Sequence, residues 1–269
     1  MGNIRSLAFG IFSLTLVLGA APAFSRDIGS FDRTLNVTGA PDLDVETNSG
    51  YITVRRGASN TVQIHAVIAV SDYWDFYAAE QRARQIEANP PISQNVNAIR
   101  IERLDDPAGR HLSISYEIEA PASTSLRART GSGGQTIEDI QGPVTASTGS
   151  GGIHISRIES EVRANTGSGS IELDSIKGRV NANTGSGSIR ASDLMDEVIA
   201  HTGSGSVQLQ LPASGGFDLH ARTGSGSVTV NPPIVMENFS SGGHDVHGRI
   251  RGGGPLIDVA TGSGSVHVD

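Results

Sequence analysis

Hydrophobic and polar residues alternate along most of this chain, and glycine-rich phrases interrupt the alternation. In "ANTGSGSIELDSIKGRVN" (Ala164 to Asn181), Ile171 and Leu173 are separated by polar residues, and Val180 and Ala182 continue the pattern into the next phrase. A period of two is typical of β-strands with one buried face. The two glycines of "TGSGS" would each cost about 1 kcal/mol inside a helix and suit a tight turn instead. Each unit therefore predicts two short strands and two corners.

The glycine phrase recurs at a fixed interval. Its threonine occurs every eighteen residues, at Thr130, Thr148, Thr166, Thr184 and Thr202. The spacing then lengthens to reach Thr223 and Thr261, and a degenerate early copy, "VETNSGYITV", covers Val45 to Val54. A fixed period is the signature of a solenoid, whose coils stack about 4.8 Å apart. We therefore predict an all-β fold, a parallel β-solenoid with 18-residue coils and one helical insert near the N-terminus.

Stacking of the coils predicts ladders of equivalent side chains. The inward rows are expected to be Val144, Val162, Val180 and Val198; Ala146, Ala164, Ala182 and Ala200; and Ile153, Ile171, Ile189 and Val207. At the second corner, within "DSIKG", Ile176 is expected to point inward. One repeat cannot bury its apolar face alone, so the coils must share one elongated core.

Upstream of the regular array, one segment has helical rather than strand periodicity. It covers residues 72–88, with Ser71 or Asp72 as its cap. The apolar stripe comprises Tyr73, Phe76, Ala79, Ala83 and Ile86. We interpret this helix as a cover for the open N-terminal end of the core. A sugar or partner site around Trp74 and Tyr77 is the alternative, because aromatic residues often anchor interfaces.

The first residues predict export. Arg5 precedes an apolar run, Leu7 to Ala20, that is short for a membrane span, and small residues then allow cleavage after Ala23 or Ser25. No transmembrane segment is expected after cleavage of this signal. The expected location is therefore the periplasm or the extracellular medium.

These patterns divide the chain into three parts. We predict a signal peptide at residues 1–25, an N-terminal β region at 26–127 that holds the helical insert, and the repeat solenoid at 128–269. The last two parts are expected to form one continuous domain, residues 26–269.

The composition excludes some kinds of site and argues against some kinds of partner. The chain has no cysteine, which excludes disulfides and thiolate metal sites. Its net charge is −8, and loss of Arg5 with the signal makes it more negative. Because nucleic acids are bound through basic patches, we expect no nucleic-acid partner.

The order of motifs resembles a known bacterial family. "FDRTLNVTG" is followed by "LDVETNSGYITV", a helical insert, "ISYEIEAP", serial "NTGSGSI" coils and a closing "HGRIRGGGPLIDVATGSGSVHV". From about Ser30 to Asp269, this order is similar to the bacterial putative-adhesin domain of unknown function, a β-solenoid envelope protein family. The resemblance implies a parallel β-solenoid in the cell envelope or outside the cell, and it supplies no catalytic residues. The chain departs from the pattern at His244 and His247.

Catalysis on a β-helix requires carboxylates or bases that cluster on adjacent coils. The outward rows are mixed instead: Thr136, His154, Glu172, Arg190 and Gln208; and Asp139, Arg157, Ser175 and Asp193. We interpret Glu172 and Arg190 as a solvated cross-ladder pair. Glu172, Asp174 and Asp193 are the nearest carboxylate candidates for a polysaccharide-active enzyme. We assign no catalytic residue and expect the protein not to be an enzyme.

Two further motifs were weighed as ligand sites. The "TGSGS" glycines lack the strand-to-helix setting of a nucleotide loop, so no cofactor is expected. "HDVH" offers two imidazoles, His244 and His247, without a third ligand nearby in sequence. We assign no metal-binding residue and interpret the motif as a surface turn, although the sequence leaves open whether these histidines bind a metal.

These observations predict a non-catalytic exported β-solenoid that serves as an adhesin-like or structural protein of the cell envelope. Its expected partner is an envelope or extracellular component, either a glycan or a protein. The alternatives are a polysaccharide-active enzyme and a periplasmic envelope-stress sensor component. We expect a monomer in which the irregular segment Asn231 to Pro255 folds over the last coils. Self-association through the C-terminal edge, Val266 to Val268, is the alternative.

Overall fold

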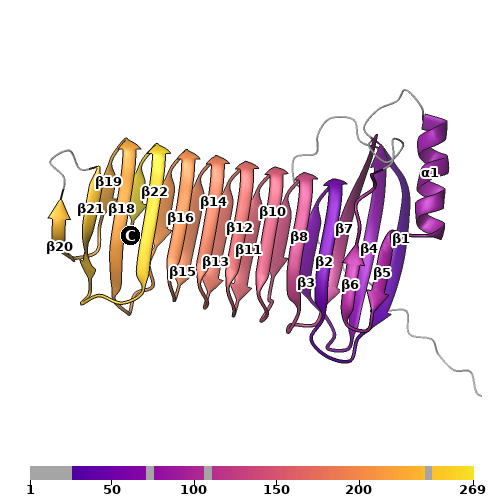
Figure 1. Ribbon diagram of the computed structural model, residues 1–269, viewed down its shortest axis with the longest axis horizontal. Coiled ribbons are helices and arrows are strands. Elements are labelled where there is room, and N and C mark those ends of the chain that lie inside the picture. Colours follow the sequence, from indigo (N-terminus) through magenta and orange to yellow (C-terminus); the bar gives the residue numbers. More distant parts are fainter. Residues whose placement is uncertain (1–25, 71–75, 106–110, 240–243) are drawn as a thin grey trace, which may run out of the picture.

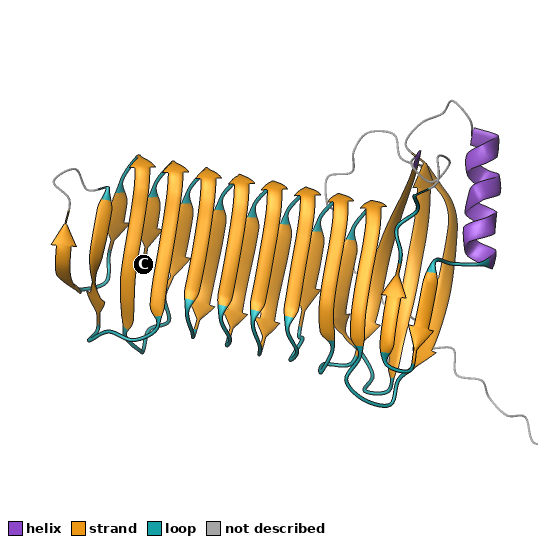
Figure 2. Ribbon diagram, in the orientation of Figure 1, coloured by secondary structure: helices purple, strands orange, loops and turns teal. Residues whose placement is uncertain are grey.

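The computed structural model describes residues 26–70, 76–105, 111–239 and 244–269. Two β-sheets face each other along the whole length of an elongated stack, and short corners join them at both sides (Figures 1 and 2). The predicted signal peptide, residues 1–25, lies outside the described residues. Within these ranges, no helix is long and apolar enough to cross a membrane.

Sheet A, as we name the first sheet, is parallel through the repeats and antiparallel near the N-terminus. Its eleven strands lie in the spatial order β1 (Arg26–Asn36), β4 (Thr61–Val70), β7 (Leu112–Ala120), β3 (Ile52–Arg56), β9 (Gln135–Glu138), β11 (Ile153–Ile158), β13 (Ile171–Ile176), β15 (Ile189–Leu194), β17 (Val207–Gln210), β23 (Val266–Val268) and β19 (Val228–Val230).

Sheet B, the second sheet, is parallel from β2 to β18 and ends in antiparallel strands. Its twelve strands lie in the order β20 (Ile234–Phe239), β21 (Asp245–Ile250), β18 (Phe217–Ser225), β22 (Leu256–Ser263), β16 (Val198–Ser204), β14 (Val180–Ser186), β12 (Val162–Ser168), β10 (Val144–Ser150), β8 (Ser125–Ser132), β2 (Asp42–Ser49), β6 (Ala98–Ile101) and β5 (Ile92–Asn95).

Each coil contributes one strand to each sheet, and equivalent residues pair directly. Ala164 pairs with Ala146 on one side and Ala182 on the other, while Ile171 pairs with Ile153 and Ile189. Every member of the three predicted inward rows is buried. The parallel β-solenoid and its 18-residue ladders are therefore confirmed. The early copy is confirmed as well, because β2 and β3 form a coil beside β8 and β9.

The first corner of each coil is too close to its neighbour for a side chain. A Cβ built on Gly169 would lie 2.0 Å from the carbonyl oxygen of Gly151, and φ of Gly169 is +154°, which L side chains rarely adopt. The threonine of the next coil holds that corner, because Thr184 Oγ1 donates a hydrogen bond of 2.9 Å to the Gly169 carbonyl. The same bond recurs at Thr148, Thr166, Thr202, Thr223 and Thr261. These two contacts explain the repeated phrase "TGSGS".

In four consecutive coils, the second corner contains a residue with left-handed backbone conformation. The residues with positive φ in this column are Asp139, Arg157, Ser175 and Asp193. In β13, the bend at Ser175 lets Asp174 and Ser175 both face outward, so that Ile176 turns back into the core. Ile176 is completely buried, as the sequence predicted.

The helical insert lies at the N-terminal end of the stack (Figure 1). Helix α1 (Phe76–Ala88) buries Ala79, Ala83 and Ile86, while Tyr77 on its outer side is 71% exposed. Glu87 Oε1 accepts a hydrogen bond of 2.8 Å from the backbone N–H of Ser30 on β1. The predicted cap residues and Tyr73 and Trp74 lie outside the described residues. The residues of α1 that the structure describes therefore agree with the prediction that this helix covers the N-terminal end of the core.

The C-terminal strand, Val266–Val268, is not an edge of the stack, although the sequence offered it as one. Strand β22 pairs in parallel with β16 and with β18, and β23 pairs with β17 and β19 (Figure 1, yellow strand β22). The last coil is thus inserted between the coils of Thr202 and Thr223. All three coils carry the same corner phrase, and an added Cβ at Gly262 or Gly224 would meet the carbonyl of its neighbour as elsewhere. Identical phrases are interchangeable in a ladder, so the order of coils need not follow the chain.

The segment between Asn231 and Pro255 is not the irregular cover that the sequence suggested. Strands β20 and β21 form an antiparallel pair, and β21 pairs with β18, so the segment extends sheet B. Val246 and Ile250 are buried on β21, with exposed Arg249 between them. The edge strands at this end of the stack are therefore β19 and β20.

We expect Ala182→Leu to destabilise the protein by about 1–3 kcal/mol through overpacking. Ala182 is fully buried between two other alanines of its row, where there is no room for three more carbon atoms. Arg190→Leu, on the exposed side of sheet A, should change the free energy of unfolding by less than about 0.5 kcal/mol. Denaturant melts measure both, and equal effects would contradict the inward assignment of the alanine row.

We expect Gly151→Ala to destabilise the protein by about 3 kcal/mol or more, because it combines a backbone clash with a strained φ. The added Cβ would lie 2.1 Å from the Gly133 carbonyl oxygen. Gly152→Ala is the matched control, since its Cβ would meet only the Ser170 carbonyl oxygen at 3.6 Å. Thermal melts of the two variants should differ widely. Similar melting temperatures would show that the corner tolerates a Cβ.

We expect the Val266 amide to exchange its hydrogen slowly in the monomer. It donates a hydrogen bond of 3.0 Å to the Ser227 carbonyl within the same chain, and β23 is paired on both sides. Hydrogen exchange followed by NMR, with the mass verified by light scattering, tests this. Protection that appears only in a dimer would contradict the inserted position of the last coil.

Candidate functional site

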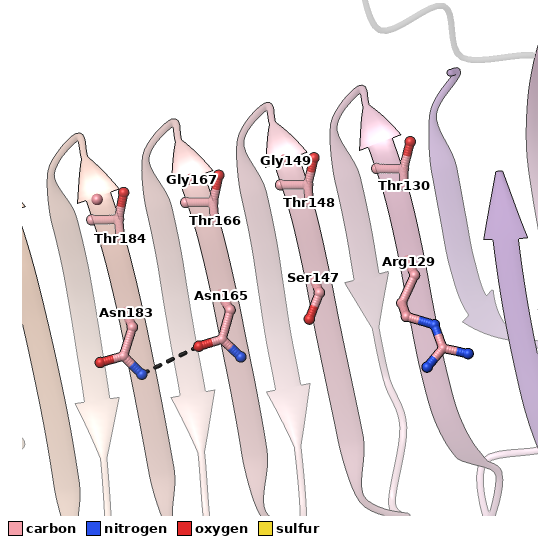
Figure 3. Close-up of a pocket in the computed structure, with 11 residues that line it drawn as sticks. Arg129, Thr130, Ser147, Thr148, Gly149, Asn165, Thr166, Gly167, Asn183 and Thr184 are labelled. Carbon is pink, nitrogen blue, oxygen red and sulfur yellow. Dashed lines mark hydrogen bonds between the residues drawn. The ribbon is translucent and has the colours of Figure 1, made fainter. Parts of the chain in front are cut away.

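The outer face of sheet B carries a row of polar side chains, one from each coil. This polar row comprises Arg129 on β8, Ser147 on β10, Asn165 on β12 and Asn183 on β14. Each residue precedes a corner threonine, so the alternation that buries the threonine points its neighbour outward. Figure 3 shows the two rows running side by side across four strands.

The polar row borders a shallow open depression of about 590 Å³. Its other side is lined by the corner threonines and by Gly149, Gly167 and Gly185, which contribute no side chains. The depression follows from the corner chemistry, because the glycines that let the coils approach also leave the surface hollow. Its long direction crosses the strands, along the axis of the stack (Figure 3).

Hydrogen bonds hold the side chains of the polar row in place. Asn183 Nδ2 donates to Asn165 Oδ1 at 3.2 Å and to Asn181 Oδ1 at 2.6 Å. At the N-terminal end, Arg129 forms ion pairs with Glu46 and with Asp44, the latter at 3.0 Å. The row therefore presents amide and hydroxyl groups in the middle and a neutralised guanidinium at one end.

The carboxylates weighed as catalytic candidates all have partners. Glu172 Oε1 lies 3.6 Å from Arg190 Nη1, which confirms the predicted cross-ladder pair. Asp174 accepts hydrogen bonds from Ser192 at 2.6 Å and from Ser175 at 3.0 Å. Asp193 lies on the second corner, 3.4 Å from the Ser175 hydroxyl. These contacts join the coils to one another and leave the three carboxylates on the exposed side of sheet A.

The shortest ion pair of the second corner joins Asp139 to Arg157. Arg157 Nε and Nη2 donate to the two carboxylate oxygens of Asp139 at 2.7 and 2.9 Å. These hydrogen bonds lower the pKa of Asp139 and raise that of Arg157. The pair is exposed to solvent, and it joins two adjacent coils at their left-handed residues.

The motif "HDVH", residues 244–247, does not form the surface turn that the sequence predicted. His247 is part of strand β21 rather than a turn, and His244 is exposed just before that strand. The partner of His247 is instead His220 on β18, and the two rings stack with centroids 3.7 Å apart. Asp245 lies within reach of both. No local sequence signal links His220 to the motif, because the pairing of β18 with the distant strand β21 brings it there.

His220 lies on β18 between β21 and β22, and its side chain is 23% exposed. Partial burial, followed by the charges of His247 and Arg222, lowers its pKa, and the carboxylates of Asp258 and Asp245 oppose this only in part. Its ordinary value is near 6.5, so this side chain is a neutral imidazole at pH 7.

Two solved bacterial proteins align with most of this chain. A putative cell adhesion protein from Clostridium sporogenes ATCC 15579 is 13% identical over 90% of this chain and 99% of its own, with a TM-score of 0.41. A putative adhesin from Bacteroides fragilis NCTC 9343 is 10% identical over 89% of this chain and 97% of its own, with a TM-score of 0.35. No curated protein matches the chain. The model of the Toastrack DUF4097 family matches residues 42–269, and the chain therefore belongs to this family.

Proposed function

We propose that this protein is a non-catalytic, exported, adhesin-like β-solenoid that binds an extended, hydroxyl-rich polymer along the polar row of sheet B. The observation that carries this proposal is the row itself, together with the open depression beside it. The polymer is a glycan of the cell envelope or of the cell's surroundings.

The shape of the depression supports an extended ligand. Sites for compact small molecules are enclosed, whereas this depression is open and crosses four coils. Equivalent groups recur once per coil, about 4.8 Å apart. The stack therefore offers polar side chains at a regular spacing to a polymer that also repeats.

The chemistry of the row supports a neutral polar ligand. Asparagine and serine side chains both donate and accept hydrogen bonds, as sugar hydroxyls do. The net charge of −8 opposes a polyanion. Arg129, the one cation of the polar row, is already paired with Asp44 and Glu46.

The arrangement of the carboxylates supports a role in binding rather than catalysis. Glu172 is about half exposed and sits between Arg190 and His154, both 3.6 Å away. These residues are on sheet A, on the opposite outer face from the polar row. A polymer bound along sheet B would not reach them.

We expect the double variant Asn165→Ala and Asn183→Ala to weaken glycan binding by roughly 1–3 kcal/mol, since two hydrogen bonds of about 0.5–1.5 kcal/mol each are lost. The measurement is a screen of glycans and peptidoglycan, followed by the dissociation constant of each hit. Gln208→Ala is the matched control, because it removes an exposed amide from β17 in sheet A. Equal losses in both variants would contradict the proposed face.

The same screen tests the absence of catalysis. We expect bound glycans to be recovered intact when the soluble fraction is analysed for products. Release of products that Glu172→Ala abolishes would replace the binding proposal with a polysaccharide-active enzyme.

A further inference from the structure

Three adjacent strands of sheet B bring Asp258, His220 and His247 directly opposite one another. Asp258 on β22 pairs with His220 on β18, and His220 pairs with His247 on β21. Asp245 is two residues before His247, and side chains two apart on a strand share a face. The four side chains therefore meet on one outer face, at the C-terminal hairpin end of the stack.

The distances within this group match those between the ligands of one metal ion. Asp245 Oδ1 lies 3.3 Å from His247 Nε2 and 3.8 Å from His220 Nε2. One ligand atom from each of the three residues lies within 4.8 Å of the others. On a tetrahedral zinc ion, bonds of 2.0–2.2 Å place the ligand atoms roughly 3.3–3.6 Å apart. The two imidazole rings now stack with 30° between their planes, so they must tilt further apart for both Nε2 lone pairs to point at one ion.

Asp258 lies behind His220, on the side away from Asp245, and among the described residues its buried Oδ1 atom accepts no hydrogen bond. Its Oδ1 atom lies 3.4 Å from His220 Nδ1, while His220 Nε2 faces Asp245. A proton on Nδ1 would point to this carboxylate and leave the Nε2 lone pair for a metal. Such a carboxylate behind a ligating histidine is the usual support of zinc sites in proteins. Arg222 Nη2, 3.5 Å from the same oxygen, balances the charge of Asp258.

A polar atom without a hydrogen bond supports the same conclusion. Within the part of the chain that the structure describes, Asp245 Oδ1 is buried and accepts no hydrogen bond. A buried carboxylate oxygen is costly when it is left without a partner. This oxygen is the atom that faces both imidazoles, so a cation bound between the three side chains would satisfy it.

We propose that His220, Asp245 and His247 bind one divalent transition-metal ion of the Zn²⁺ class. The ligand atoms are Nε2 of each histidine and Oδ1 of Asp245. Asp245 and His247 are both about 40% exposed, so water can occupy the fourth position. Two imidazole nitrogens and one carboxylate oxygen suit Zn²⁺ better than Mg²⁺ or Ca²⁺, which prefer oxygen ligands alone.

The metal would join the terminal hairpin to the solenoid. His220 belongs to the coil of Thr223, whereas Asp245 and His247 belong to the added antiparallel strand. Binding would therefore clamp β21 to β18 beside the edge strand β20. This inference is independent of the proposed glycan binding, because it rests on other strands and other residues.

The test is isothermal titration calorimetry of the full protein with ZnCl₂, without a histidine tag. We expect one ion per chain in the wild type and loss of measurable binding in His220→Gln and in His247→Gln. His244→Gln is the matched control from the same motif and should bind as the wild type does. Asp258→Asn should weaken binding about 10–100-fold, which is the usual effect of removing a residue that supports a metal ligand.

A second measurement keeps the test independent of how the variants fold. In the wild type, NMR of the imidazole nitrogens should show ZnCl₂ shifting His220 and His247 and leaving His244 unchanged. Wild-type protein that binds no zinc, or binding that survives both ligand substitutions in folded protein, would overturn the proposal. Loss of binding in His244→Gln would overturn it in favour of a site made by His244 and His247 alone.

Discussion

The approach of one glycine corner to the next is the contact on which the rest of the structure depends. Parallel pairing brings the backbones of adjacent coils to about 4.8 Å. At the corners the carbonyl oxygen of one coil occupies the space that a Cβ would need in the next, as at Gly151 and Gly169. Only glycine fits there, and the threonine hydroxyl of the neighbouring coil satisfies that carbonyl. The second glycine of the phrase is therefore the residue that close stacking requires at this corner, and the early copy keeps it as Gly50.

The same constraint shapes both sides of the sheets. With the corners in register, inward valines, alanines and isoleucines form continuous rows, which bury a core that no single coil could make. Outward side chains fall into rows as well, and the corner glycines leave a hollow beside one of them. The polar row of sheet B is thus a consequence of the stacking. Its side chains point outward, so the stacking does not determine which amides and hydroxyls occupy it.

Different elements complete the two ends of the stack, where a coil has no further coil to pair with. At the N-terminal end, antiparallel strands continue sheet A, and helix α1 packs Ala79, Ala83 and Ile86 against the core. At the other end, the last coil is inserted between two earlier ones, and the hairpin of β20 and β21 extends sheet B. That extension places His247 beside His220, so the metal-binding group depends directly on how this end is completed.

Much of the fold follows from the sequence alone, because short-range chemistry determines it. The period of eighteen, the glycine corners and the alternation define the parallel coils, their inward rows and the outward pair of Glu172 with Arg190. The polar row could not be distinguished in advance, since outward polar residues carry the same pattern whether they bind a ligand or water.

Which strands become neighbours was decided only by the tertiary structure. Copies of "TGSGS" are interchangeable, so the sequence cannot order the coil of Thr261 relative to that of Thr223. The meeting of His220 with Asp245 and His247 depends on long-range antiparallel pairing, which no local spacing records.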